Sequence, residues 1–82
     1  MYEVLVTKRA SKDLQKLDPQ IRTGIIKKIK EYSNAPYHYA RKLIDPAIGS
    51  YRFRIGDYRV IFDIDEDKIV LLRIGHRKDI YK

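Results

Sequence analysis

The N-terminal half of the chain combines one short apolar run with the hydrophobic spacing of helices. Residues 2–6 are rich in β-formers and predict a first strand. Thr7 suits the N-cap of a helix whose apolar residues recur at spacings of four and three, at Ala10, Leu14 and Leu17. Asp18 is expected to cap a second helix with Pro19 at its first position, and the segment 33–36 ends that helix. Two helices joined so closely predict an antiparallel hairpin. The apolar face of the second helix consists of Ile21, Ile25, Ile26, Ile29 and Tyr32.

The C-terminal half changes to a period of two, which is typical of strands. Residues 37–48 are expected to form a loop, after which residues 51–55 alternate strictly between polar and apolar side chains. Gly56 and Asp57 provide a two-residue turn with glycine first, as a type II′ turn requires. The remaining segments are a strand over 58–64, a three-residue turn over 65–67 and an apolar strand over 68–74.

This order of elements predicts an α+β domain with the arrangement β-α-α-β-β-β. The helical hairpin packs on one face of an antiparallel four-stranded sheet, and the last strand, which is the most apolar, lies in the middle of it. A chain of 82 residues is long enough for one domain, 1–82, and its hydrophobic fraction of 44% favours a folded protein over a disordered one.

The turn at Gly56 and Asp57 fixes a register that gathers arginines on one face of the sheet. Arg54 faces Arg59 and Arg52 faces Ile61, while the opposite face must be the core, formed by Tyr51, Phe53, Ile55, Tyr58, Val60 and Phe62. If the turn at 65–67 has three residues, Arg59 also faces Arg73, and the core side of the last strand carries Val70, Leu72 and Ile74.

Like charges opposed across strands destabilise a sheet, so four clustered arginines indicate an anion on that face. The alternative is that acidic neighbours neutralise them, with Asp63 on the same face and Asp57 beside the turn as candidates. Overall charge favours the anionic partner, because 18 Lys and Arg residues against 11 Asp and Glu residues give +7. A charge that merely aids solubility is the competing interpretation.

Other features of the composition exclude whole classes of protein. The chain has no cysteine, so it has neither a disulfide framework nor a thiolate metal site. It also lacks an apolar run of the ~20 residues that a membrane span needs. Because its N-terminal charges follow the apolar run, the order of a signal peptide is absent, and we expect a cytoplasmic protein without membrane association.

The chain resembles the RelE/ParE superfamily of type II toxins, and its RelE-like branch in particular. The resemblance lies in the element order, in YRFRIGDYRVIF (51–62), in the apolar last strand and in GHRKDIY (75–81). It implies an endoribonuclease that uses no metal or cofactor and cuts mRNA in the ribosomal A site. The 2′-hydroxyl of the RNA attacks the neighbouring phosphate and leaves a 2′,3′-cyclic phosphate and a 5′-hydroxyl. It also implies a cognate RelB-like antitoxin as partner, with which the toxin can form a heterotetramer.

The resemblance also assigns roles to individual residues. Its catalytic positions match Arg52, Arg54, Arg59, Arg77 and Tyr81. Further contacts to RNA are expected from Arg73, His76 and Lys78. Guanidinium groups suit phosphoryl oxygens, but arginine does not deprotonate in proteins, and the best-known members carry lysines where this chain has Arg52 and Arg54. The proton-transfer group therefore stays open between Tyr81 and His76, and His76 equally suits a structural position facing the core.

Two other functions remain open at the level of sequence. One is a ParE-like inhibitor of DNA gyrase, and the other is a catalytically weak homologue that only binds RNA. The dense arginine cluster favours the nuclease, since an inhibitor that binds a protein needs no phosphate-binding sheet. The antitoxin is expected to be acidic or to present an amphipathic segment. Apolar residues that the predicted register leaves on the arginine side offer such a segment a groove, namely Ile61, Ile69 and Leu71.

Overall fold

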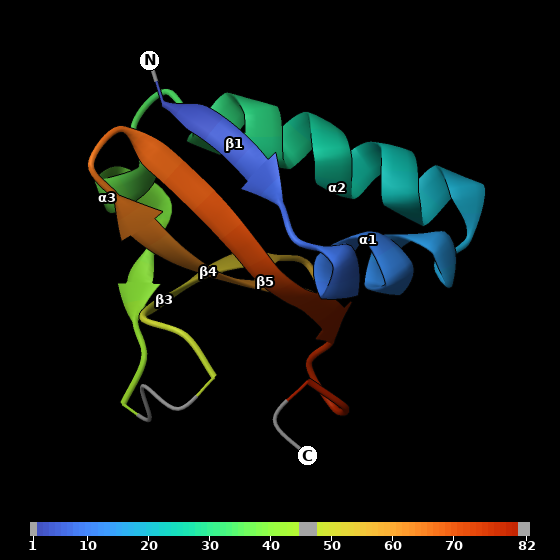
Figure 1. The fold of residues 1–82 in the computed structure, drawn as a ribbon. Helices are drawn as coiled ribbons and strands as arrows, with labels where there is room; N and C mark the ends of the chain where they lie inside the picture. Colours follow the sequence, from blue (N-terminus) through green and yellow to red (C-terminus); the bar gives the residue numbers. More distant parts are fainter. Residues whose placement is uncertain (1, 45–47, 81–82) are drawn as a thin grey trace.

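The computed structural model describes residues 2–44 and 48–80, which form one sheet with two long helices packed on one of its faces (Figure 1). The elements in chain order are β1 (Glu3–Val6), α1 (Lys8–Gln15), α2 (Pro19–Tyr32), α3 (Pro36–Tyr39), β2 (Arg41–Lys42), β3 (Tyr51–Ile55), β4 (Tyr58–Asp65) and β5 (Lys68–His76). The strands lie in the order β1-β5-β4-β3-β2. The predicted α+β class, with a helical hairpin on one side of the sheet, is confirmed. Within the described ranges no helix is long and apolar enough to cross a membrane.

Two details of the predicted sheet are wrong. The sheet has five strands rather than four, because the segment expected to be a loop contains α3 and the short strand β2, which pairs with β3. Residues 45–47 of that predicted loop lie outside the described residues. The sheet is also mixed rather than antiparallel, because the helical hairpin returns the chain so that β1 and β5 run parallel.

The first helix begins where the sequence predicts and is tied to the sheet at that point. The Thr7 hydroxyl accepts a hydrogen bond from Ala10 N at 3.2 Å and donates one to Leu71 O at 2.7 Å. Thr7 therefore caps α1 and fixes its start against β5. Asp18 occupies the N-cap position of α2 as predicted, with Pro19 following, but its side chain makes no capping hydrogen bond.

The β3–β4 hairpin has the predicted register. Arg54 pairs with Arg59 and Ile55 with Tyr58, and Gly56 adopts the positive φ of 59° that its turn requires. The side of this hairpin that faces the helices is the core, where Phe53, Val60 and Phe62 are fully buried. They pack in one cluster with Ile25 and Ile29 of α2.

The predicted β4–β5 register is wrong. The turn has two residues, because Asp65 pairs with Lys68 and Glu66 takes a φ of 56°. Ile69 and Leu71 therefore face the core in place of Val70 and Leu72. A β-bulge at Leu72 then shifts the pairing by one residue, which returns Ile74 to its predicted core position. As a result Arg59 pairs with Gly75, and Arg73 pairs with Ile61.

Candidate nucleic-acid interface

The sheet face opposite the helices carries arginines from four adjacent strands. We call it the arginine face, and its members are Arg41, Arg52, Arg54, Arg59 and Arg73. Residues paired across neighbouring strands project to the same side of the sheet, so they form two rows across this face. One row runs Arg41, Arg52, Ile61, Arg73, and the other runs Arg54, Arg59, Gly75. The predicted gathering of Arg52, Arg54 and Arg59 is thus confirmed, whereas Arg41 was missed because its two-residue strand has no recognisable period.

Arg59 is the most buried of the arginines on this face. Its side chain is only 5% exposed, and its Nη1 donates hydrogen bonds of 2.9 Å to Gly56 O and to Tyr58 O. The guanidinium therefore holds the backbone of the β3–β4 turn and adds a buried positive charge there, while its cross-strand partner Arg54 is exposed. In low dielectric such a charge acts strongly on a nearby anion.

Arg77 joins the arginine face from the segment after β5. Its backbone N donates to Asp57 O at 2.8 Å, and its Nε lies 3.7 Å from a carboxylate oxygen of Asp57. Both side chains are more than half exposed, so this ion pair is weak and a phosphate can replace it. Arg77 therefore lies at the β3–β4 turn, the end of the sheet that also carries Arg54 and Arg59.

Arg73 differs from the other arginines because a buried carboxylate partly neutralises it. Asp13 of α1 is 8% exposed and accepts hydrogen bonds of 2.9 Å from Arg73 Nε and from Ile74 N. Since β1 pairs only with residues 68–71 of β5, the backbone edge at Ile74 has no neighbouring strand, and Asp13 occupies that edge. The predicted neutralisation by an acidic residue thus applies to Arg73, through a residue that sequence reasoning did not consider.

The segment after β5 folds back over the arginine face. His76 O accepts hydrogen bonds from Asp79 N at 2.9 Å and from Ile80 N at 3.0 Å. Ile80 is 5% exposed, and its Cδ1 lies 3.2 Å from the position that a Cβ on Gly75 would occupy. A residue other than glycine at 75 would therefore push this segment away. The predicted catalytic Tyr81, which follows Ile80, lies outside the described residues.

His76 lies on the opposite side of the sheet from the arginines. It pairs with Tyr58, whose ring it meets edge-on at 5.4 Å between ring centroids, and its Nδ1 accepts a hydrogen bond from Lys78 N at 3.1 Å. These contacts match the structural position that the sequence left open for this residue. Lys78 is exposed in the turn that follows β5.

The apolar groove expected on the arginine side is absent from the described residues, since Ile69 and Leu71 belong to the core. Ile61 does face that side, but the segment 48–50 covers it. A Cβ on Gly49 would lie 2.5 Å from Ile61 Cγ2, and Asp63 holds the segment by accepting a hydrogen bond from Ser50 N at 2.8 Å. Asp63, one of the two acidic residues that the sequence offered as neutralising partners, is thus engaged with backbone, whereas the other, Asp57, forms the ion pair with Arg77.

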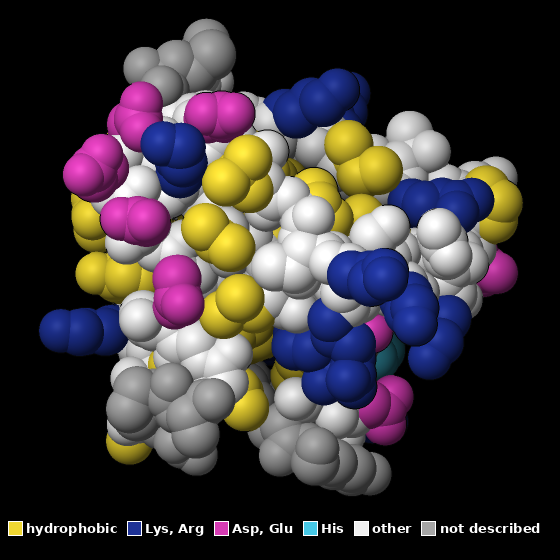
Figure 2. Space-filling view, in the orientation of Figure 1, with side chains coloured by type: hydrophobic (Ala, Val, Ile, Leu, Met, Phe, Trp, Pro, Cys, Tyr) yellow, Lys and Arg dark blue, Asp and Glu magenta, His cyan; other side chains and the backbone are white. Residues whose placement is uncertain are grey.

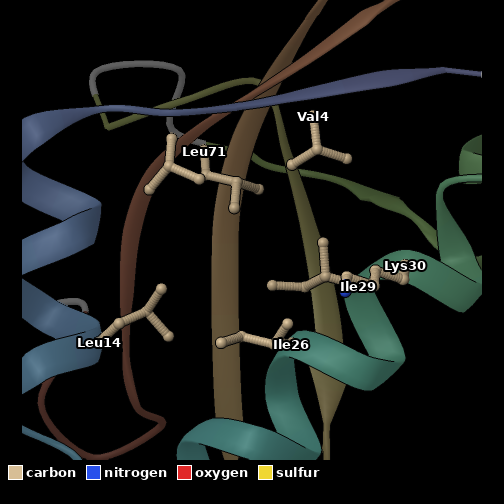
Figure 3. A pocket seen from close by; sticks show the side chains of 7 residues that line it. Val4, Leu14, Ile26, Ile29, Lys30 and Leu71 are labelled. Carbon is tan, nitrogen blue, oxygen red and sulfur yellow. The ribbon is translucent and has the colours of Figure 1, made fainter.

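An apolar cleft instead lies on the helical side, between β1 and the two long helices (Figure 3). Its volume is about 270 Å³, and its walls are formed mainly by Val4, Val6, Leu14, Ile26, Ile29 and Leu71. Lys30 is the one polar side chain among the described residues that line it. Within residues 2–44 and 48–80, no three His, Asp or Glu side chains gather as a metal ion would need.

Charge is distributed unevenly over the molecule. The β4–β5 turn carries the exposed acidic residues Asp65, Glu66 and Asp67. In Figure 2 acidic side chains gather at that end of the sheet, and basic side chains gather over α1. Because β4 joins the two turns, the arginines at the β3–β4 turn lie at the end of the strand remote from this acidic turn. A polyanion is therefore attracted to one end of the arginine face and repelled from the other.

Comparison with known proteins finds a family model and relatives that are all described as toxins. Residues 4–81 match the family model described as ParE toxin of type II toxin–antitoxin system, parDE. The chain is 33% identical to Toxin RelG of Mycobacterium tuberculosis, over 99% of this chain and 97% of that protein. It is 35% identical to Toxin RelE3 of Methanocaldococcus jannaschii, over 96% of this chain and 94% of that protein.

Solved structures agree with these sequence matches. The toxin–antitoxin complex RelBE2 of Mycobacterium tuberculosis contains a chain that superposes with a TM-score of 0.83 at 32% identity, covering 93% of this chain and 98% of that one. The isolated RelE toxin of E. coli superposes with a TM-score of 0.75 at 26% identity, covering 99% of this chain and 92% of that one.

Proposed function

The chain belongs to the family of ParE toxins of type II toxin–antitoxin systems, and from that premise we propose that it is a ribosome-dependent mRNA endoribonuclease. Relatives above 30% identity include proteins named Toxin RelG, Toxin RelE3 and Putative toxin RelE4. The proposal also places the protein in the cytoplasm, because the ribosome with its A-site mRNA is the proposed target.

The observation that carries this proposal is the concentration of guanidinium groups on one sheet face. Arg54 and Arg59 are opposed across a hairpin, and Arg77 reaches the same turn from the end of β5. Guanidinium groups gathered on one face attract anions, and the phosphates of RNA supply negative charge at regular spacing. Planar guanidinium groups also match phosphoryl oxygens with paired hydrogen bonds.

The proposed chemistry is cleavage by the RNA itself, with the protein stabilising charge. The 2′-hydroxyl oxygen bonds to the adjacent phosphorus, and the bond from phosphorus to the 5′-oxygen breaks. A general base takes the proton of the 2′-hydroxyl, and a general acid gives a proton to the departing 5′-oxygen. Arg52, Arg54 and Arg77 are assigned to the phosphoryl oxygens, where negative charge grows in the transition state. Arg59 adds the positive charge of its buried guanidinium, which is bonded to the β3–β4 turn.

Proton transfer is assigned to Tyr81 in preference to His76. The position of His76 on the helical side, against Tyr58, supports this choice, because that side chain is separated from the arginines by the sheet. Arginine itself is unsuited, since it keeps its proton at all physiological pH values.

A gyrase inhibitor is the second candidate, and the description of the matching family model as the parDE toxin favours it. The two functions make different demands on the arginine face. Cleavage needs Arg54 and Arg77 near a phosphate, whereas a protein inhibitor tolerates their loss unless they contact gyrase. Supercoiling by gyrase in the presence of the toxin measures this alternative directly.

An antitoxin is the proposed protein partner. The similar chains from Mycobacterium tuberculosis and from Methanococcus jannaschii were solved as toxin–antitoxin complexes, and a heterotetramer is the assembly we expect for this chain. An acidic antitoxin segment that neutralises the arginine face would bind less tightly as salt rises. Binding that is insensitive to salt would place the antitoxin on apolar surface instead.

The experiment that tests the proposed function is primer extension on mRNA held in programmed ribosomes. We expect cuts within the A-site codon, no cuts without ribosomes, and their loss in Arg77→Ala. Arg9→Ala is the matched control, because it removes the same charge from an exposed position on α1. Intact mRNA with correctly folded wild-type protein would contradict the nuclease and leave the gyrase inhibitor as the better explanation.

A further inference from the structure

The short helix α3 concentrates exposed aromatic rings. Tyr37 is 59% exposed and Tyr39 is 40% exposed, and His38 between them is exposed as well. In the part of the chain that the structure describes, every other tyrosine and phenylalanine is buried or half-buried. Such exposure of large rings within four residues marks a contact surface rather than chance.

These rings are held in place by a series of ring contacts that reaches the core. Tyr39 stacks on Tyr32 with 4.0 Å between ring centroids and 11° between planes, and Tyr32 meets the buried Phe53 edge-on at 5.3 Å. Tyr37 meets Tyr51 at 5.8 Å and Tyr2 at 6.5 Å, both nearly perpendicular. Desolvation, followed by the neighbouring Tyr51 and Tyr2 groups, raises the pKa of Tyr37, so its hydroxyl stays neutral. Rings ordered in this way lose little entropy when they bind.

Positive charge follows the rings in the chain. Arg41 and Lys42, both exposed, form β2 immediately after α3 and Ala40. Arg41 pairs with Arg52 and so belongs to the arginine face, whereas the α3 rings contact Tyr51 on the helical side, so the two surfaces meet across the edge strand β2. Exposed aliphatic residues include Leu5 and Val6 on β1 and Ile44, which follows β2 in the chain.

We propose that Tyr37, His38, Tyr39, Arg41 and Lys42 form a second RNA contact, which we call the α3 platform, and that unpaired bases stack on it. The inference rests on the proposed function, because it extends the RNA path from the arginine face across the β2 edge. Aromatic rings interleaved with cations bind single-stranded RNA, since every base offers a π face and every nucleotide a phosphate. Tyrosines also occur at protein interfaces, so the choice of RNA rests on Arg41 and Lys42, whose positive charges match the phosphates of RNA.

The test is binding of a fluorescein-labelled ten-nucleotide oligoadenylate, 2′-O-methylated so that it cannot be cut, measured by anisotropy with the full chain. Tyr37→Ala is expected to weaken binding by about 5- to 100-fold, the range for loss of one stacked base. Tyr37→Phe keeps the ring and is expected to bind within about twofold of wild type, because stacking needs no hydroxyl. Ile44→Ala, which removes exposed apolar surface from a side chain that touches nothing, is the matched control and leaves binding unchanged.

Three outcomes would overturn the inference. They are equal binding by Tyr37→Ala and wild type, no binding of the oligonucleotide by wild type, and loss of antitoxin binding in Tyr37→Ala with RNA binding intact, which would mark a protein interface. Thermal unfolding of each variant excludes misfolding, and Tyr37→Phe separates loss of the ring from loss of structure.

The two proposals fail separately. Wild type that binds the oligonucleotide through Tyr37 but leaves A-site mRNA intact contradicts only the nuclease, and cleavage with Tyr37-independent binding contradicts only the platform.

Discussion

The two faces of the sheet differ in how they treat the chain's polar groups. The helical face buries Phe53, Val60 and Phe62 completely and admits one carboxylate, Asp13, which is held by two hydrogen bonds. The arginine face instead opposes Arg54 to Arg59 across one hairpin. The first arrangement favours folding, and the second opposes it. The difference places the favourable packing on the helical face, and it motivates our proposal that the arginine face serves binding.

The largest effect should follow from opening the helical face. Phe53→Ala removes a fully buried ring that contacts Phe62 at 4.2 Å and Tyr32 at 5.3 Å between ring centroids. We expect the free energy of unfolding to fall by about 3–5 kcal/mol, because the cavity cannot close fully. Urea unfolding followed by circular dichroism measures this loss. A fall below about 1 kcal/mol would mean that the core is not where stability resides.

The next largest effect concerns the single buried carboxylate on the helical side. Asp13→Ala leaves Ile74 N without its acceptor and releases the partly exposed Arg73 to solvent. The expected loss of unfolding free energy is about 1–3 kcal/mol, the range for a buried polar group left unsatisfied. Because Asp13 belongs to α1 and not to the arginine face, A-site cleavage by the folded fraction should persist. Loss of cleavage at full stability would instead assign Asp13 to the site.

A smaller effect is expected at the start of α1. Thr7→Ala removes both the cap on Ala10 N and the hydrogen bond to Leu71 O, and should lower the unfolding free energy by about 1 kcal/mol. Thr23→Ala is the matched control, because Thr23 is exposed within α2 and caps nothing. Equal unfolding midpoints for the two variants would contradict the claim that the hydrogen bonds of Thr7 to α1 and β5 stabilise the fold.

The sequence predicted the β3–β4 hairpin better than the β4–β5 hairpin, and the reason is local. Gly56 indicates the position of the first turn in the sequence, since glycine tolerates the positive φ that a two-residue turn needs. The second turn obtains its positive φ from Glu66, which carries no such signal. The bulge at Leu72 then reverses the one-residue error. The prediction that Ile74 faces the core was therefore right, although its predicted pairing partner was wrong.

The candidate site shows the same division between local and distant determinants. The meeting of Arg52, Arg54 and Arg59 follows from one short turn and was predictable. Arg41 reaches the arginine face through a two-residue pairing with β3, which no periodicity announces. The contact between Asp13 and Arg73 joins residues 60 positions apart, so only the packing of α1 on β5 brings them together.

The measurement that tests the contrast between the faces most directly is the charge reversal Arg54→Glu, assayed for both stability and cleavage. It replaces a like-charge pair with an opposite-charge pair opposite Arg59, so we expect the unfolding free energy to rise by about 0.2–1 kcal/mol. The same protein should lose cleavage of A-site mRNA by at least about 100-fold, the effect of removing one donor to a developing oxyanion. Arg9→Glu on α1 controls for the change in net charge. A less stable Arg54→Glu protein, or one that still cuts, would contradict the assignment of the arginine face to function.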